Sequence, residues 1–269
     1  MKDCDNYISY RDIISHIDIK GGDIVNVSSD ILKLICVCRE NDEAFDANIF
    51  IDAIIRKIGN SGTLLFPTYN WGFCKGGVFD YRNTLSQVGA LSNAALKRED
   101  FKRTRHPIYS FAVWGHDRDY LCDLNNISAF GADSPFAYLY HRGAKNLFIG
   151  LDYKDGLAFV HYAEETAGVD YRYFKDFRGP YIDKTGIKKD LTFRMYVRNP
   201  RLCAETVISP QLDDILLNKG YYSRYTINGI YFGLIDLRGI GDIIEHDIRI
   251  KGGLIYSKAT KDVQYSRSE

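Results

Sequence analysis

The stretch IVNVSSDILKL (residues 24–34) decides the fold class, because it joins a strand to a helix. Its first four residues, IVNV, favour an extended chain, and they follow the turn residues GGD (21–23). Ser28, Ser29 and Asp30 come next, and residues of these types cap the N-termini of helices. The stretch therefore predicts a strand, a cap and a helix start. Free backbone N–H groups at such a junction suit a phosphate or a carbonyl oxygen.

The same alternation of strands and helices continues to residue 168. The predicted helices are ANIFIDAIIRKIG (47–59), SQVGALSNAALKRED (86–100), SPFAYLYHRG (134–143) and FVHYAEETAG (159–168). The predicted strands are in NSGTLLFPTYNW (60–71), IYSFAVWG (108–115) and NLFIGL (146–151). This alternation is typical of an α/β core.

The last hundred residues have a different pattern. GPYIDKTGIKKDLTFRMYVRN (179–199) predicts a hairpin around Thr185 and Gly186, and the segment 221–257 has strand-like pieces separated by Gly and Asn. No linker rich in Pro or Ser divides the chain. We therefore expect one α/β domain over residues 1–269, with a central mixed sheet flanked by helices and extra antiparallel strands in the C-terminal third.

Composition limits the possible partners and locations. The 269 residues include 35 basic and 35 acidic side chains, so the concentrated basic excess of a nucleic-acid-binding protein is absent. Apolar runs such as LKLICVC (32–38) are too short to span a membrane, and the N-terminus lacks the apolar core of a signal peptide. We expect a cytoplasmic protein, monomeric or homodimeric, that binds neither nucleic acid nor membrane.

The six cysteines favour reduced thiols over a metal site. Cys36 and Cys38 alternate within a run that favours a strand, so both are expected on the same face. A CxC pair lacks the CxxC spacing, and no second pair completes a zinc site. We expect no metal.

The segment FVHYAEE (159–165) carries an imidazole and two carboxylates in an otherwise apolar helix. His161 is followed three residues later by Glu164 and four later by Glu165, and side chains at these spacings share a helix face. A carboxylate there can hold one ring nitrogen and leave the other free, as a general base requires. The segment alone also fits a solvated face or a buried polar pair.

Seven segments carry a family resemblance when they are taken in order. They are VSSD (27–30), IGNSGTLLFPTYN (58–70), FDYRNTLSQVGALSNAALKRED (79–100), RTRHPIYSFAVWG (103–115), FGADSPFAYL (130–139), NLFIGLDY (146–153) and FVHYAEE (159–165). In this order and spacing they resemble the aminoglycoside 3-N-acetyltransferase family, also called the antibiotic acetyltransferase family. The resemblance covers about residues 20–175.

The resemblance implies a reaction and a pair of catalytic residues. Members of the family move an acetyl group from acetyl-CoA, as co-substrate, to an amine of an amino sugar, on a single α/β domain of their own type. The histidine and glutamate of the family motif match His161 and Glu164. An ammonium has no lone pair, so the acceptor must lose a proton before it attacks the thioester, and a histidine can take that proton.

The resemblance also implies binding residues. Ser28 and Ser29 match the turn that binds pantetheine and the acetyl group, although the pattern equally fits a plain helix cap. Arg103 and Thr104 match a position where a guanidinium can pair with a CoA phosphate. Ser134 matches a Ser-Pro that caps a helix and can contact CoA.

Two acidic residues are expected near the acceptor. Asp80 in FDYR matches an acidic position of the family that can receive a cationic amino sugar, and the alternative is a surface turn. Glu165 is the other carboxylate one turn from His161 and is expected to bind substrate. His106 and Pro107 are expected to fix the start of a strand rather than to do chemistry.

The sequence departs from the family in two places. Many members have a threonine shortly before the histidine, whereas this chain has Ala158 and Phe159, so another group must stabilise the tetrahedral intermediate. Residues 176–269 match no motif of the family, and we expect them to shape the acceptor pocket.

Several functions stay open at this point. The neutral charge favours a less cationic acceptor than an aminoglycoside, such as a nucleotide-linked amino sugar for surface polysaccharide. The alternative acceptor is an aminoglycoside, which would make the protein an antibiotic-resistance enzyme. A hydrolase with Ser28 or Ser29 as nucleophile lacks the G-x-S-x-G motif. A non-catalytic CoA-binding protein is the remaining alternative, supported by the missing threonine.

Overall fold

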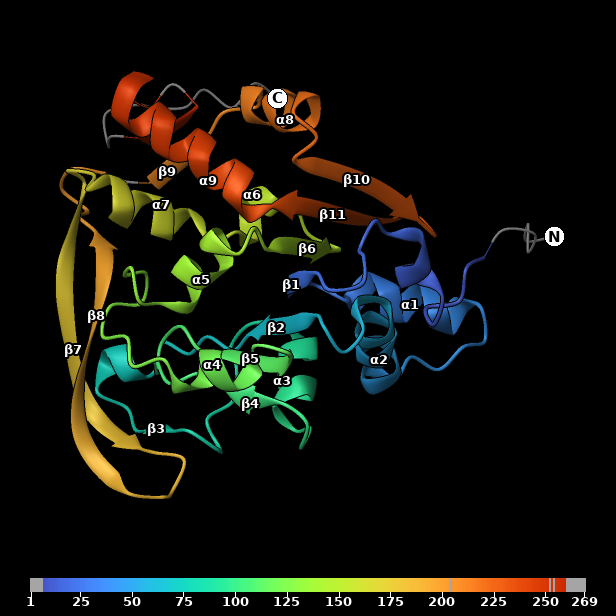
Figure 1. Ribbon diagram of the computed structural model, residues 1–269, viewed down its shortest axis with the longest axis horizontal. Helices are drawn as coiled ribbons and strands as arrows, with labels where there is room; N and C mark the ends of the chain where they lie inside the picture. Colours follow the sequence, from blue (N-terminus) through green and yellow to red (C-terminus); the bar gives the residue numbers. More distant parts are fainter. Residues whose placement is uncertain (1–6, 204, 252, 254, 260–269) are drawn as a thin grey trace.

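A computed structural model describes residues 7–203, 205–251, 253 and 255–259 (Figure 1). Its central strands are β1 (Ile24–Ser29), β2 (Thr63–Pro67), β4 (Lys102–Arg103), β5 (Phe111–Gly115), β6 (Lys145–Ile149), β10 (Tyr222–Ile227) and β11 (Ile230–Asp236). Within the described residues these form a seven-stranded sheet in the order β10-β11-β6-β1-β2-β5-β4. Strands β6, β1 and β2 are parallel, and the outer strands pair antiparallel. The predicted central mixed sheet is confirmed.

Helices cover both faces of this sheet. They are α1 (Leu32–Glu40), α2 (Ala47–Ile58), α3 (Ala90–Leu96), α4 (Arg118–Asp123), α5 (Pro135–His141), α6 (Tyr153–Gly156), α7 (Val160–Ala167), α8 (Gln211–Asn218) and α9 (Leu237–His246), with shorter turns η2 (Ile13–His16), η3 (Phe73–Lys75) and η4 (Asp247–Lys251). Figure 1 shows α1 and α2 on one side of the strands, and α5, α7 and α9 on the other. Among the described residues, no helix combines the length and the apolar character that crossing a membrane requires.

The sheet is buried on both faces because its central strands carry apolar residues toward both of them. In β2, Leu64 and Phe66 join the core beneath α1, α2 and α3, whereas Leu65 between them joins the core beneath α5, α7 and α9. In β6, Phe148 and its neighbours divide between the two cores in the same way. Parallel strands covered by helices on both faces have this continuous apolar pattern.

The C-terminal part adds two smaller sheets. Strands β7 (Arg172–Ile182) and β8 (Lys188–Arg198) form the predicted hairpin, and β3 (Phe79–Asp80) pairs parallel to β7. Strands β9 (Glu205–Ile208) and β12 (Tyr256–Ala259) pair antiparallel. Figure 1 shows the β7–β8 hairpin as a long ribbon at the left edge of the molecule, next to α7.

Local signals fix the ends of several predicted helices. Asp46 caps α2, because its side chain accepts hydrogen bonds from the backbone N–H groups of Asn48 and Ile49. Ser134 caps α5 through its bond from the N–H of Ala137. Gly168 ends α7 with a φ of +67°, a conformation that glycine adopts without steric cost. These helices begin and end within one or two residues of the predicted bounds.

Two local predictions are wrong. The run LKLICVC is helical within α1 rather than extended, so Cys36 and Cys38 point in different directions, and only Cys38 is buried. Ser28 and Ser29 belong to β1 rather than to a helix cap, because the ladder with β6 continues through Ser29. The helix starts at Leu32, whose N–H bonds to the carboxylate of Asp30.

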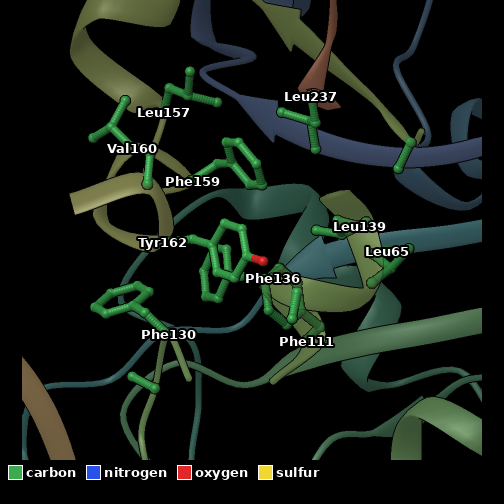
Figure 2. Close-up of a cluster of buried hydrophobic side chains, with 14 of the residues drawn as sticks. Leu65, Phe111, Phe130, Phe136, Leu139, Leu157, Phe159, Val160, Tyr162 and Leu237 are labelled. Carbon is green, nitrogen blue, oxygen red and sulfur yellow. The ribbon is translucent and has the colours of Figure 1, made fainter. Parts of the chain in front are cut away.

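An aromatic cluster attaches α7 to the body of the domain (Figure 2). The ring of Phe136 lies with its centroid 5.2 Å from that of Phe111 and 5.0 Å from that of Phe130. Phe159 directly precedes α7, and its ring centroid lies 5.6 Å from that of Tyr162 within the helix. Both belong to the same cluster. This packing holds α7 in place, and with it the side chains on the other face of the helix.

Candidate active site

His161 and Glu164 form a pair on one face of α7, as their spacing predicts. The imidazole Nδ1 lies 2.7 Å from Oε2 of Glu164. The carboxylate is fully buried, whereas a quarter of the His161 side chain is exposed. Since a carboxylate accepts hydrogen bonds, Nδ1 carries the proton and Nε2 is free to take one. The ring of Phe130 meets the imidazole edge to face at 5.3 Å and restricts its orientation.

Glu164 has two further partners in the segment after α7. Nε of Arg172, at the start of β7, lies 2.7 Å from Oε2, the same oxygen that faces His161. The hydroxyl of Tyr171 donates to Oε1 at 3.0 Å. Burial by itself raises the pKa of Glu164, but the His161 hydrogen bond and the charges of His161 and Arg172 outweigh it and lower the pKa below its ordinary value. Glu164 is therefore ionised at neutral pH.

His161 opens onto a cavity of about 530 Å³. The cavity lies where the parallel strands β1, β2 and β6 end, because Ser28, Ser29 and Pro67 line it together with residues of the segment 151–158, which contains α6. Ligands commonly bind at the carboxyl ends of parallel strands, where the connecting loops diverge.

A glycine lets the loop after β6 cross the end of β1. Gly150 has a φ of +70°, and a Cβ at this position would lie 2.1 Å from the carbonyl oxygen of Asp30. Any other residue would push the loop away from β1. This close approach places Leu157 and Ala158, which line the cavity, directly before α7.

Aromatic side chains form much of the cavity wall. Tyr69 and Trp71 follow β2, and the ring of Tyr109 lies 4.6 Å from Tyr69 and 6.3 Å from Trp71. Thr206, Ile208 and Tyr256, from β9 and β12, close another side. The charged groups among the described lining residues are Lys154 and Asp155.

Only some of the residues expected to bind acetyl-CoA lie at the cavity. Ser28 and Ser29 line the cavity, and the Ser28 hydroxyl accepts a bond from the side chain of Asn146. Arg103, Thr104 and Ser134 are buried elsewhere. Their roles in CoA binding stay predictions.

Arg103 is engaged entirely by the protein. Its guanidinium donates to the Ser110 hydroxyl and to the carbonyl oxygens of Thr84 and Thr68, and it lies over the ring of Phe79. Burial lowers the pKa of Arg103 to about 10, which leaves it charged at neutral pH. The hydroxyl of Thr104 accepts the N–H of Phe111, so both residues join β4 to its neighbours.

The residues expected near the acceptor lie outside the described cavity. The carboxylate of Asp80 accepts bonds from the backbone N–H groups of Arg82 and Asn83 and from the side-chain amide of Asn83. Glu165 points toward the loop before α5, where Ser128 donates to its carboxylate. Burial raises the pKa of Glu165 above its ordinary value. Neither is next to His161 in the cavity, and their roles in acceptor binding stay predictions.

His106 does structural work. Its ring is fully buried, and Nδ1 accepts the N–H groups of Ile108 and Tyr109. Burial lowers the pKa of His106 to about 3, so the ring is neutral. The residue shapes the chain just before β5, as the sequence indicates.

Sequence patterns gave no sign of the tyrosine and arginine partners of Glu164. Arg172 and Tyr171 follow the glycine that ends α7, and only the return of the chain into β7 brings them to Glu164. Tyr256 reaches the cavity from the far end of the chain. Across the described ranges, no three His, Cys, Asp or Glu side chains lie close enough to hold a metal ion.

Comparison with known proteins identifies relatives of this chain. The model of the aminoglycoside 3-N-acetyltransferase family matches residues 36–246. A prophage-derived aminoglycoside N(3')-acetyltransferase-like protein of Bacillus subtilis (strain 168) is 29% identical over 86 residues, which is 32% of this chain. That alignment spans 31% of the relative's length, so the chain matches about a third of it.

Solved structures share the fold over most of their length. The aminoglycoside acetyltransferase AAC(3)-Xa is 20% identical, with a TM-score of 0.72 over 89% of this chain and 91% of that one. AAC-IIIb in a binary complex with CoASH is 16% identical, with a TM-score of 0.73 over 90% of this chain and 96% of that one. Sisomicin-bound AAC-VIa is 18% identical, with a TM-score of 0.73 over 91% of this chain and 99% of that one. The chain belongs to the aminoglycoside 3-N-acetyltransferase family.

Proposed function

We propose that the protein transfers an acetyl group from acetyl-CoA to the amine of an amino sugar, with His161 as general base and Glu164 as the group that holds its ring. One observation carries this proposal. His161 is the only histidine among the described residues that line the cavity, and its Nδ1 is held at 2.7 Å by a buried carboxylate. Nε2 is then available to a substrate.

The acceptor ammonium must lose two protons to become the amide. His161 takes the first at Nε2, either directly or through a water, and the neutral amine attacks the carbonyl carbon of the thioester, while the second proton leaves the nitrogen to solvent as the amide forms. The C–N bond forms, the C–S bond breaks, and the imidazolium returns the proton to the departing thiolate of CoA. Glu164 stabilises the imidazolium while it exists.

The end of β1 is the proposed site for the acetyl thioester. Ser28 and Ser29 line the cavity, and backbone N–H and hydroxyl groups there are suited to a developing oxyanion. Ala158 also lines the cavity, and Phe159 is buried in the aromatic core, so neither supplies the hydroxyl that a threonine would. We assign the stabilisation of the tetrahedral intermediate to this serine pair.

The cavity favours an acceptor with few positive charges. Lys154 forms an ion pair with Asp213 at 3.0 Å, Asp155 adds a single carboxylate, and the remaining wall is largely aromatic and aliphatic. Rings such as those of Tyr69, Trp71 and Tyr109 suit the apolar faces of a sugar or a base. A nucleotide-linked amino sugar is therefore the preferred acceptor.

Family membership supports the aminoglycoside as a second acceptor. AAC-VIa has been solved with sisomicin bound, and its fold covers 91% of this chain. An aminoglycoside is a polycation, and binding one benefits from a strongly acidic site. Asp155 is the only carboxylate that faces the cavity among the described lining residues, which is why this acceptor ranks second.

We further propose that residues 1–269 work as one catalytic domain. The motif-bearing part, about residues 20–175, supplies His161, Glu164 and the serine pair. Thr206, Ile208 and Tyr256 of the later part line the same cavity, which supports a role for residues 176–269 in shaping the acceptor pocket.

Thiol release from acetyl-CoA tests the proposal. Purified protein is incubated with acetyl-CoA and either a panel of aminoglycosides or a panel of nucleotide-linked amino sugars. Release with only the second panel supports the preferred acceptor, whereas release with aminoglycosides overturns the charge argument. CoA binding without release in either panel contradicts the proposed acceptors and favours a non-catalytic CoA-binding protein.

A further inference from the structure

One carboxylate oxygen of Glu164 faces two cationic partners at once. Oε2 lies 2.7 Å from Nδ1 of His161 and 2.7 Å from Nε of Arg172. The two nitrogens can therefore be no farther apart than twice that distance. When His161 is protonated, it lies beside a second positive charge that Glu164 must also compensate.

The guanidinium is fixed in this position. The Arg172 side chain is 8% exposed, and its Nη1 donates to the backbone oxygen of Tyr196 on the paired strand β8. Glu164 has no exposed surface at all. Water therefore screens the contact weakly, and charge interactions there are stronger than at the surface.

Other titratable groups near the pair are tyrosines or lie on the cavity wall. They are Tyr171, Tyr196 and Tyr256 beside Glu164, Tyr109 beside Arg172, and Lys154 and Asp155 on the cavity wall. Burial raises the pKa of each of these four tyrosines, so they are uncharged at neutral pH. Arg172 is the permanent cation in direct contact with Glu164.

We propose that Arg172 is a positioning residue that shares the charge of Glu164, so that Glu164 fixes the ring of His161 without favouring its protonated form as strongly as an unshared carboxylate would. This inference rests on the proposed role of His161. A buried carboxylate that faced the imidazole alone would strongly favour the imidazolium, which cannot act as a base. Sharing Oε2 with Arg172 weakens that preference while the carboxylate still fixes the ring.

Three substitutions distinguish the effect of the Arg172 charge from the effect of its hydrogen bonds and packing. Arg172→Gln removes the positive charge and keeps a hydrogen-bond donor of similar reach. Arg172→Lys keeps the charge and changes the geometry. Tyr171→Phe removes a neutral donor from the other oxygen of Glu164 and is the matched control.

The first readout is the titration of His161 in the ligand-free protein. The ring proton signals of the histidines are followed by NMR against pH, and His161→Gln assigns the signal. In Arg172→Gln the midpoint is expected to move upward by roughly one pH unit, because an unshared carboxylate favours the imidazolium. Arg172→Lys and Tyr171→Phe are expected to titrate near the parent protein.

The second readout is the pH profile of kcat/KM with the best acceptor. In Arg172→Gln the acid limb of this profile is expected to shift to higher pH by the same amount. In Arg172→Lys it is expected to lie at nearly the same pH as in the parent protein. An unchanged His161 midpoint in folded Arg172→Gln overturns the proposal, as does an equal shift in Tyr171→Phe. The NMR titration needs no turnover, so failure of this inference is distinguishable from failure of the proposed function. If Arg172→Gln does not fold, a shifted midpoint in Arg172→Lys contradicts the charge argument.

Discussion

The partly exposed imidazole of His161 lies against the fully buried carboxylate of Glu164, with 2.7 Å between Nδ1 and Oε2. The contact therefore links a side chain that lines the cavity to one in the interior of the protein. Glu164 also contacts Arg172 and Tyr171, so the ring of His161 is held by a network that reaches into β7. Catalysis and stability are therefore expected to respond together when this network is changed.

Replacing Glu164 with glutamine should damage both properties. Arg172 would lose its counterion in a buried setting, and breaking such a pair costs about 3–5 kcal/mol of unfolding free energy. Chemical denaturation measures this loss, and kcat should fall because the imidazolium is no longer stabilised. Glu165→Gln is the matched control, because Glu165 points toward Ser128 instead. Equal losses in the two variants would refute the special role of Glu164.

A double substitution tests the coupling of Glu164 and Arg172. Glu164→Gln with Arg172→Gln removes both charges, so no buried charge is left without a partner. The double variant should be more stable than the Glu164→Gln variant alone, by about 1–3 kcal/mol. Denaturation curves for the parent, both single variants and the double variant give the coupling energy. Strict additivity of the losses would contradict the ion pair.

His106 should make stability depend on pH. Burial lowers its folded-state pKa to about 3, whereas the unfolded chain has an ordinary histidine pKa of about 6.5. Between these values the unfolded state binds more protons, so stability falls as pH falls, by at most about 1.4 kcal/mol per pH unit.

Comparing His106→Asn with the parent isolates this contribution. The unfolding free energy of both proteins is measured at several pH values between 6.5 and 4, where the carboxylates contribute to both slopes alike. The difference between the slopes should match the loss of one titrating group. Identical slopes would show that His106 does not titrate in this range.

Arg103→Met should reduce stability far more than CoA affinity. The guanidinium makes three hydrogen bonds to the protein, and its removal leaves buried oxygens without donors. A loss of about 2–4 kcal/mol is expected by denaturation. Calorimetry of CoA binding to the folded variant should give a dissociation constant close to that of the parent. A large loss of affinity in a stable variant would instead support the phosphate contact that the family motif implies.

Trp71→Ala should weaken the binding of the acceptor. The Trp71 ring lies at the cavity wall against Tyr109, and an aromatic contact of this kind contributes about 0.5–1.5 kcal/mol. The KM for the acceptor should rise by up to about tenfold with little change in kcat. Steady-state kinetics with varied acceptor provide the measurement. A lower kcat at unchanged KM would place Trp71 outside the acceptor site.

Much of the fold could be predicted because its signals are local. Helix α2 shows its apolar spacing and its terminal glycine within one segment, and the β7–β8 hairpin turns at the predicted Thr185 and Gly186. The run LKLICVC misled the prediction because a short apolar run fits a strand and a buried helix equally well. Tertiary packing beneath α1 decides in favour of the helix.

In the candidate site, too, only contacts within one segment could be predicted from the sequence. His161 and Glu164 are three residues apart in one helix, so their contact follows from sequence spacing alone. Arg172 reaches Glu164 only because the chain turns at Gly168 and enters β7, and Tyr256 arrives from another sheet. For Arg103, the family resemblance singles out the residue but not its contacts. In the structure its guanidinium is buried and bonds to the Ser110 hydroxyl and to two backbone oxygens.

The most direct measurement compares acetyl transfer by the parent protein and by His161→Ala, with CoA binding measured in both. The account predicts that the variant binds CoA about as tightly as the parent and loses transfer by on the order of 10²–10⁴-fold at pH 7. Full transfer by the variant at that pH would contradict the assignment of His161 as the base.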